Sequence, residues 1–310
     1  MPVVLGIDGG GTKTMCAIAR DGVLLGTSTT GASNLIRVSD EDAKLALLSA
    51  IRAACQTSGI TPNQIEAACL GIGGASRENI AARVREIVGE VLHCPCEIVG
   101  DMLIAYDAAM RGGPGVVVIA GTGSIAYGHN ERGESARAGG WGSVISDEGS
   151  GYWIGRNAVA AAFRALDSGR STVLIRFIMD RWRVVTRDEL IAFANSNPQP
   201  NFSELAPAVF EAGAQGDTTA QELLSDAGAE LAKLAKVVIR RLWPGSHAIE
   251  IAALGGIFTH SKFVYKVFEN SIRSERSTAN IRLLTEDPVQ GALFRAEKLL
   301  RDSQAVGEEP

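Results

Sequence analysis

Residues 3–14 read VVLGIDGGGTKT, and residues 115–124 read GVVVIAGTGS. In both, an apolar, β-branched run ends in a loop of glycine and threonine. A second strand-like run follows each loop, Thr14–Ala19 in the first copy and Ile125–His129 in the second. The two copies lie roughly one domain length apart, whereas solenoid repeats are ~20–50 residues long. The pattern therefore predicts a duplicated domain.

The segments around each copy alternate between strand and helix patterns. In the first half, apolar spacing predicts strands at Val23–Thr27, Ile65–Ile72 and Glu97–Val99 and helices at Asp40–Thr57, Arg77–Val91 and Asp101–Met110. The second half is mostly helical between Tyr152 and Leu242. After it we expect strands at Ile249–Leu254 and Ile281–Leu284, a turn at Gly255-Gly256, helices at Ser261–Arg273 and from Pro288 to about Arg301, and a frayed tail at Asp302–Pro310. Strands mixed with helices in this order indicate an α/β fold.

Composition excludes several classes of protein. Of 310 residues, 46% are hydrophobic and 21% charged, which is typical of globular chains. Thirty basic against 35 acidic side chains leave a net charge of −5, without the basic surface that nucleic acid binding requires. There is no apolar run of the ~20 residues that span a bilayer, and from the first residues we expect no signal peptide. Five cysteines, an odd number, fit reduced thiols, so we expect a cytoplasmic protein. From the charge and the apolar pattern we expect that it binds neither nucleic acid nor membrane.

Glycine is enriched, at 35 residues, and part of the excess lies in the two loops. Glycine and threonine loops can hold phosphate groups through backbone N–H groups. The sequence contains no Gly-Lys dipeptide, which excludes a Walker A loop, and no dinucleotide-binding fingerprint opens a helix. Both loops instead join two strands. We therefore expect two loops that face one phosphate chain across a cleft.

Four stretches resemble the N-acetylglucosamine kinases and, more broadly, the BadF/BadG/BcrA/BcrD ATPase group of the actin-like, sugar kinase and Hsp70 superfamily. They are residues 8–14 (DGGGTKT), 121–124 (GTGS), 139–142 (GGWG) and 147–155 (DEGSGYWIG). The resemblance extends from Gly6 to the closing helix. It implies two actin-like (ribonuclease H-like) α/β domains of duplicated topology around an ATP cleft. Residues 1–113 with the helix 288–302 would form an N-terminal sugar- and phosphate-binding domain, and residues 114–287 a C-terminal nucleotide-binding domain.

Asp101 is the candidate catalytic base. It follows the strand Glu97–Val99 and begins a helix, where a carboxylate can accept the proton of an attacking sugar hydroxyl. The same position suits a helix N-cap, and one carboxylate can serve both roles. Asp107 is a rival that lies within the helix. The family pattern places its catalytic aspartate at the position of Asp101.

The resemblance also assigns the binding residues. Asp8 would face the Mg²⁺ of the nucleotide through water, and Asn34, Ser76, Asp101, Ser124, Asp147 and Gly151 would contact the sugar. The phosphates and the nucleoside would be bound by Gly10, Gly11, Thr12, Lys13, Thr122, Gly123, Gly255 and Gly256, with the last pair as the adenosine-binding turn. Lys13 could equally point to solvent.

The expected reaction is transfer of the γ-phosphoryl group of ATP to the 6-hydroxyl of an amino sugar, with N-acetylglucosamine the first candidate. Glucosamine and N-acetylmuramate are the nearest alternative substrates. A different alternative is an ATPase that activates a partner protein, and a third is a sugar sensor without catalysis. The related kinases suggest a homodimer. All five cysteines precede Gly121, whereas the activator ATPases hold an iron–sulfur cluster beyond that loop, so we expect neither zinc nor an iron–sulfur cluster.

Overall fold

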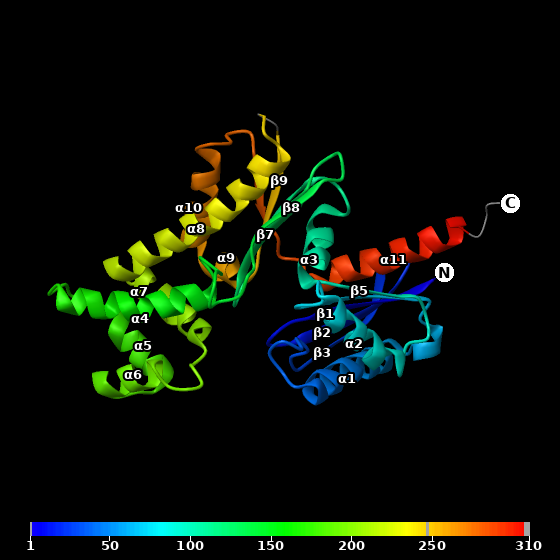
Figure 1. The fold of residues 1–310 in the computed structure, drawn as a ribbon, viewed down its shortest axis with the longest axis horizontal. Coiled ribbons are helices and arrows are strands. Elements are labelled where there is room, and N and C mark those ends of the chain that lie inside the picture. The colour runs from blue at the N-terminus through cyan, green and yellow to red at the C-terminus, as the bar shows by residue number, and fades with distance from the viewer. Residues whose placement is uncertain (1, 246–247, 307–310) are drawn as a thin grey trace. The chain divides into compact units, whose positions relative to one another are not determined.

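The computed structural model describes residues 2–245 and 248–306. The chain forms two compact units, Met1–Gly113 with Glu286–Pro310 and Pro114–Thr285 (Figure 1). Each unit contains a five-stranded sheet. The two sheets have strand orders β3-β2-β1-β4-β5 and β10-β9-β6-β7-β8, which are the same order when read from opposite ends. The duplicated topology expected from the two glycine loops is confirmed.

The sheet of the first unit begins with a three-stranded meander. Strands β1 (Val3–Gly9), β2 (Thr14–Arg20) and β3 (Val23–Thr30) pair antiparallel, and β1 and β2 are joined by the first glycine loop. Strands β4 (Ala67–Ile72) and β5 (Cys96–Val99) then extend the sheet in parallel from β1. The parallel strands end at one edge of the sheet, so the residues that follow them lie close to the loop after β1.

Helices cover both faces of this first sheet. Figure 1 shows α11 (Val289–Val306) on one side and α1 (Asp40–Ser58) with α2 (Glu78–Gly89) on the other. Helix α3 (Asp101–Met110) packs against α11, and the short 3₁₀ helix η1 spans Pro62–Gln64. The last helix of the chain therefore belongs to the core of the first unit, where it packs on β1 and β4.

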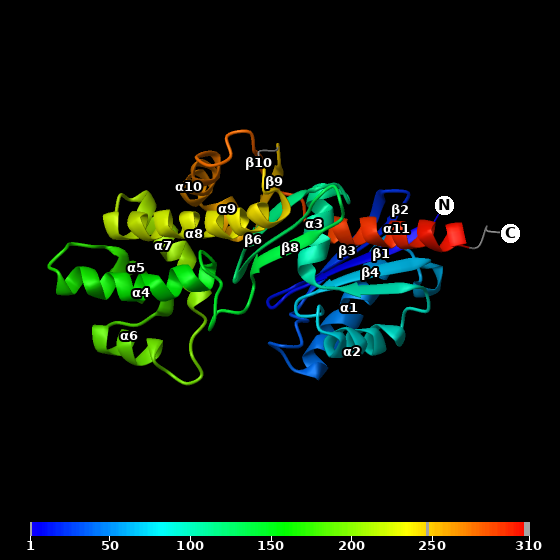
Figure 2. The same cartoon turned by 45° about the horizontal axis from the view of Figure 1, so that its top comes forward.

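The second unit repeats the meander with β6 (Gly115–Ala120), β7 (Ser124–His129) and β8 (Ser135–Gly139), and β9 (Glu250–Leu254) and β10 (Asn280–Leu283) continue it in parallel. Figure 2 shows helices gathered beside this sheet. They are α4 (Gly151–Asp167), α5 (Leu174–Trp182), α6 (Arg187–Ala194), η2 (Phe202–Leu205), α7 (Ala206–Ala214), α8 (Thr218–Leu242), α9 (Gly256–His260) and α10 (Lys262–Arg273). Their apolar faces form one core with the sheet.

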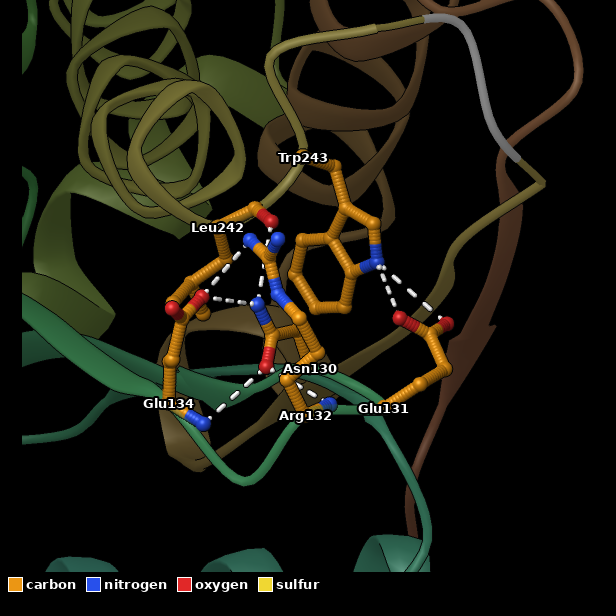
Figure 3. Close-up of polar contacts among 6 residues, drawn as sticks. All are labelled: Asn130, Glu131, Arg132, Glu134, Leu242 and Trp243. Atoms are coloured by element: carbon orange, nitrogen blue, oxygen red, sulfur yellow. Dashed lines mark hydrogen bonds and ion pairs between the residues drawn. The ribbon is translucent and has the colours of Figure 1, made fainter.

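The turn between β7 and β8 is fixed to the end of α8 (Figure 3). The Asn130 carboxamide accepts the backbone N–H groups of Arg132 and Glu134, both at 3.0 Å, and donates to the Leu242 carbonyl at 3.3 Å. The Trp243 indole N–H donates to the Glu131 carboxylate at 3.1 Å. These contacts attach the β7–β8 hairpin to Leu242 and Trp243 at the end of α8.

Three local features differ from the predictions. Residues 135–139, which we did not expect to be a strand, form β8, and the expected turn at Gly255-Gly256 leads directly into the short helix α9. The closing helix continues to Val306, through the first part of the expected tail, and residues 307–310 lie outside the described residues. Among the described helices, none has the length and apolar character needed to cross a membrane.

Candidate active site

The first glycine loop is tied to the segment that follows β3. Within the loop, the Gly10 N–H donates to the Lys13 carbonyl at 2.9 Å, which closes the turn between β1 and β2. The Gly10 carbonyl accepts the N–H groups of Ser33 and Asn34, at 3.1 and 3.2 Å. The predicted phosphate loop and the predicted sugar residue Asn34 are therefore neighbours. Gly11, Thr12 and Lys13 are exposed, so their polar groups are accessible to a ligand.

Asn34 and Asp101 meet over Gly73. A Cβ atom placed on Gly73 would lie 2.7 Å from Asn34 Nδ2 and 3.4 Å from Asp101 Oδ2. Ser76 is close as well, because a Cβ on Gly100 would lie 3.8 Å from the Ser76 Cβ. The Gly73 N–H donates to the Gly9 carbonyl at 2.8 Å, which joins this group to the glycine loop. The lack of a side chain at Gly73 lets the amide and the carboxylate approach each other.

Asp101 is the first residue of α3, and Gly100 is its N-cap. The Asp101 Oδ1 accepts the Met102 N–H at 2.9 Å, so the carboxylate still satisfies a backbone donor at the helix start. Its side chain reaches solvent, but protein surrounds the carboxyl group and displaces much of its water. This desolvation raises the pKa of Asp101 above its usual range, while the backbone donors and Arg37 oppose the rise. A carboxyl group with a raised pKa is suited to taking up a proton.

Asp8 is shielded from water and lies near two other carboxylates. The pKa of Asp8 is raised to about 7, chiefly by desolvation and also by the charges of Asp101 and Asp287, while the charge of Lys13 opposes the rise. Asp8 forms no salt bridge among the residues that the structure describes. A divalent cation would relieve this excess of negative charge, and Mg²⁺ favours one or two carboxylates combined with phosphate oxygens and water. The residues present therefore fit the expected magnesium ion.

Asp107, the rival base, is held in an ion-pair network. Its Oδ2 accepts from Arg295 Nη1 at 2.7 Å, and Arg295 Nε donates to Glu97 Oε2 at 3.0 Å. The Asp107 side chain is buried. The network joins α3, β5 and α11 through Asp107, Glu97 and Arg295. Asp107 is thus already paired with a cation, whereas the Asp101 carboxylate forms no salt bridge in the described residues and lies beside Gly73.

A cavity of about 380 Å³ adjoins this group in the first unit. Leu35, Ile36, Asp40, Arg77, Asn79, Ile80 and Arg83 line it. A Cβ on Gly74 would lie 2.4 Å from Ile36 Cδ1 and 3.5 Å from Ile80 Cδ1, so the cavity begins one residue beyond Gly73. Arg83 is paired with Asp40 at 2.7 Å, whereas Arg77 has no salt-bridge partner within the described part of the chain.

In the second unit, the loop between β6 and β7 contacts the segment before α4. A Cβ on Gly123 would lie 2.9 Å from Asp147 Oδ2, and the Ser124 N–H donates to Asp147 Oδ1 at 3.4 Å. The Ser124 hydroxyl donates to the Glu148 carbonyl at 2.8 Å. Asp147 is buried and has a φ of +71°, an uncommon conformation for aspartate. Three predicted residues are thus brought together, with Asp147 supporting the loop.

The remaining predicted residues of the second unit adjoin the same loop. The Gly151 N–H donates to the Gly121 carbonyl at 2.8 Å, and the Tyr152 N–H donates to the Thr122 carbonyl at 3.2 Å. Gly255 has a φ of +100°, and a Cβ there would lie 2.4 Å from the Ala120 carbonyl oxygen. Only glycine fits this position. Gly256 then begins α9, so the expected adenosine-binding turn lies directly beside the end of β6.

The sequence pattern alone does not single out Arg37 or Gly73 in the first unit. Their significance depends on contacts with Gly11, Asn34 and Asp101, which only the folded chain brings together. Within the described residues, no group of three or more His, Cys, Asp or Glu side chains is arranged to hold a metal ion. The five cysteines are free thiols, and Cys16, Cys55 and Cys69 are buried.

Several known proteins with similar sequences or structures are sugar kinases by name. The sequence model of the BadF/BadG/BcrA/BcrD ATPase family matches residues 5–296. The N-acetylmuramic acid/N-acetylglucosamine kinase of Clostridium acetobutylicum is 30% identical over 96% of this chain and 98% of its own length. The N-acetyl-D-glucosamine kinase of Dictyostelium discoideum is 30% identical over 95% and 97%. The structure of a candidate N-acetylglucosamine kinase from Chromobacterium violaceum matches with a TM-score of 0.77 and 28% identity, over 95% of this chain and 98% of that one.

Proposed function

Because the chain belongs to the BadF/BadG/BcrA/BcrD ATPase family, we propose that it is an ATP-dependent kinase of amino sugars. It transfers the γ-phosphoryl group of ATP to the 6-hydroxyl of the sugar, and N-acetylglucosamine is the first candidate. One observation carries the proposal. The Asn34 amide and the Asp101 carboxylate both lie beside Gly73. The Gly73 N–H donates a hydrogen bond to the carbonyl of Gly9, where the first glycine loop begins. A sugar-binding amide, a base and a phosphate loop are thereby combined in one unit.

In the proposed mechanism, Asp101 accepts the proton of the sugar 6-hydroxyl while the oxygen of that hydroxyl attacks the γ-phosphorus. Desolvation, which raises the pKa of Asp101, makes its carboxylate a better proton acceptor. Gly11, Thr12 and Lys13 would bind phosphate oxygens, since positioning and charge stabilisation dominate phosphoryl transfer. Asp8 would hold Mg²⁺, through water, and the ion would neutralise charge on the phosphates.

The two units would divide the binding work. Residues 1–113 and 289–306 would bind the sugar and the terminal phosphates, and residues 114–285 would bind the nucleotide. Thr122 and Gly123 would bind phosphate oxygens, and Gly255 with Gly256 would allow the adenosine to lie against the backbone. Ser124 and Asp147, which are buried, would together with Gly151 hold the loop of Thr122 and Gly123 in place.

A coupled assay of ADP release tests the function. The purified protein is given ATP and Mg²⁺ with N-acetylglucosamine, glucosamine, N-acetylmuramate or no sugar. We expect N-acetylglucosamine to raise ADP release at least about a hundredfold above the control without sugar, because water is a poorly positioned competitor. Equal ADP release with and without every sugar would instead support an ATPase that acts on a partner protein.

N-acetylmuramate is the second candidate substrate, and the cavity next to Ser76 supports it. This sugar differs by a lactyl group that carries a carboxylate, and Arg77 lies in the cavity without a salt-bridge partner in the described chain. If the carboxylate binds there, Arg77→Gln should raise the KM for N-acetylmuramate about tenfold and leave that for N-acetylglucosamine unchanged. An equal effect on both sugars would exclude a role for Arg77 in choosing between them.

A further inference from the structure

Arg37 lies where the phosphate loop and the sugar residues of the first unit meet. Its backbone N–H donates to the Asn34 carbonyl at 2.8 Å, so it is held one turn after the sugar-binding asparagine. Its side chain extends over the glycine loop. A Cβ atom on Gly11 would lie 2.9 Å from Arg37 Cδ, 3.4 Å from Nη1 and 3.5 Å from Nε. The guanidinium therefore lies directly above backbone that is expected to hold phosphate.

The guanidinium of Arg37 has no anion of its own. It forms no salt bridge in the described residues, whereas Arg83 and Arg295 are each paired with two carboxylates. The Arg37 side chain is exposed, and its positive charge lowers the pKa of Asp101. An accessible cation near both the loop and the base has the position that a transferring anionic group would require.

We propose that Arg37 binds the γ-phosphate of ATP and stabilises the phosphoryl group while it is transferred. The inference rests on the proposed function. The planar guanidinium can donate two parallel hydrogen bonds to phosphate oxygens, a geometry that lysine cannot reproduce. In the step, a bond forms between the sugar oxygen and the γ-phosphorus, and the bond from that phosphorus to the β-phosphate oxygen breaks. The electron pair leaves with ADP and the proton goes to Asp101, while Arg37 keeps its own protons.

The test compares Arg37→Gln and Arg37→Lys with the control Arg52→Gln, which removes an exposed arginine of the same unit from α1. Calorimetry in Mg²⁺ measures the affinity for ADP and for the non-hydrolysable analogue AMP-PNP. We expect Arg37→Gln to weaken AMP-PNP binding about 10–100-fold and to leave ADP binding unchanged, because only the analogue has the third phosphate. Arg37→Lys should recover part of the loss, and Arg52→Gln should match the wild type.

Steady-state kinetics supply the second readout. In Arg37→Gln, kcat should fall about 10²–10³-fold, and the acidic limb of the kcat/KM profile should move to higher pH, because Arg37 no longer lowers the pKa of Asp101. Equal losses of ADP and AMP-PNP affinity, or unchanged affinity for both, would overturn the inference. The outcome is separable from that of the proposed function, which fails if the wild type shows no sugar-dependent ADP release.

Discussion

Asp101 and Asp107 lie on the same helix, α3, but their surroundings differ. Asp101 reaches solvent beside Asn34, whereas Asp107 is buried and bound to Arg295. We predict that Asp101→Asn lowers kcat about 10²–10⁴-fold with little change in the affinity for sugar or ATP, since the amide cannot accept the proton. Steady-state kinetics and calorimetry measure the two effects.

The matched variant is Asp107→Asn, which leaves Arg295 with one of its two carboxylate partners. We expect a lower melting temperature and a kcat within tenfold of the wild type at a temperature where the variant is folded. A collapse of kcat in Asp107→Asn, combined with normal turnover in Asp101→Asn, would assign the base to Asp107.

The pKa of Asp8 gives stability a pH dependence. In the folded chain it is raised to about 7, from an ordinary value of 3.8. Below pH 3.8 both the folded and the unfolded states are protonated at this site. As pH rises toward 7, the unfolded chain releases its proton first, so the folded state loses stability, and the loss is complete above pH 7.

Asp8→Asn removes this penalty. We predict that the variant gains stability relative to the wild type between pH 4 and pH 8, by at most about 4 kcal/mol at 1.36 kcal/mol per pKa unit. Urea denaturation at the two pH values measures the gain, which should shrink when Mg²⁺ and ATP are bound to the wild type. The same stability difference at both pH values would show that Asp8 is not destabilised by its charge.

Single residues differ in how far the sequence reveals their roles. Asp101 was proposed as the base from its place at the end of a strand pattern, and Asn34 as a sugar contact from the resemblance to the kinases. Arg37 could not be found in this way, because it lies in an irregular loop and its importance arises from the position of its side chain over Gly11. The pairing of Asp107 with Arg295 joins residues 188 positions apart, which no local pattern encodes.

At the scale of elements, α11 depends on two glycines. A Cβ on Gly6 of β1 would lie 2.9 Å from the Leu293 backbone nitrogen, and one on Gly291 would lie 1.8 Å from the Ile104 carbonyl oxygen. These gaps allow the helix to lie close to both β1 and α3. The glycines in question carry no turn or loop signal, so their role in packing is visible only in the structure.

We therefore predict that Gly291→Ala destabilises the first unit by about 1–3 kcal/mol or more, because backbone atoms of α3 must move. The control is Gly89→Ala, in α2, where a Cβ meets nothing within 4 Å and where the change should stabilise the helix by up to about 1 kcal/mol. Thermal unfolding of the two variants measures the contrast. Equal melting temperatures would show that α11 can shift without a loss of stability.

The elements that were missed also have physical explanations. Strand β8, Ser135–Gly139, contains no β-branched or aromatic residue, so its strand conformation comes from pairing with β7 rather than from its own propensity. The adjoining turn is held by Asn130 and Trp243, which come from distant parts of the chain. Helix α9 has five residues and begins at a glycine, which sequence patterns assign to a turn.

At the scale of the whole molecule, duplication was the most predictable property. The two β-meanders repeat the same order, and the first glycine loop connects Gly9 to Thr14 while the second connects Ala120 to Ser124. Each unit also has its own hydrophobic core. The period of the repeat and the apolar runs encode these features directly. The substrate is encoded less directly, because it depends on which polar groups converge after folding.

The central claim is that one molecule of ATP gives one phosphorylated amino sugar. Two-dimensional ¹H–³¹P NMR of a reaction with ATP, Mg²⁺ and N-acetylglucosamine measures this directly. We predict a new phosphomonoester signal that is coupled to the protons on C6, growing in equal amount with ADP and absent in Asp101→Asn. Inorganic phosphate as the sole new phosphorus product besides ADP, formed at the same rate with and without sugar, would contradict the account.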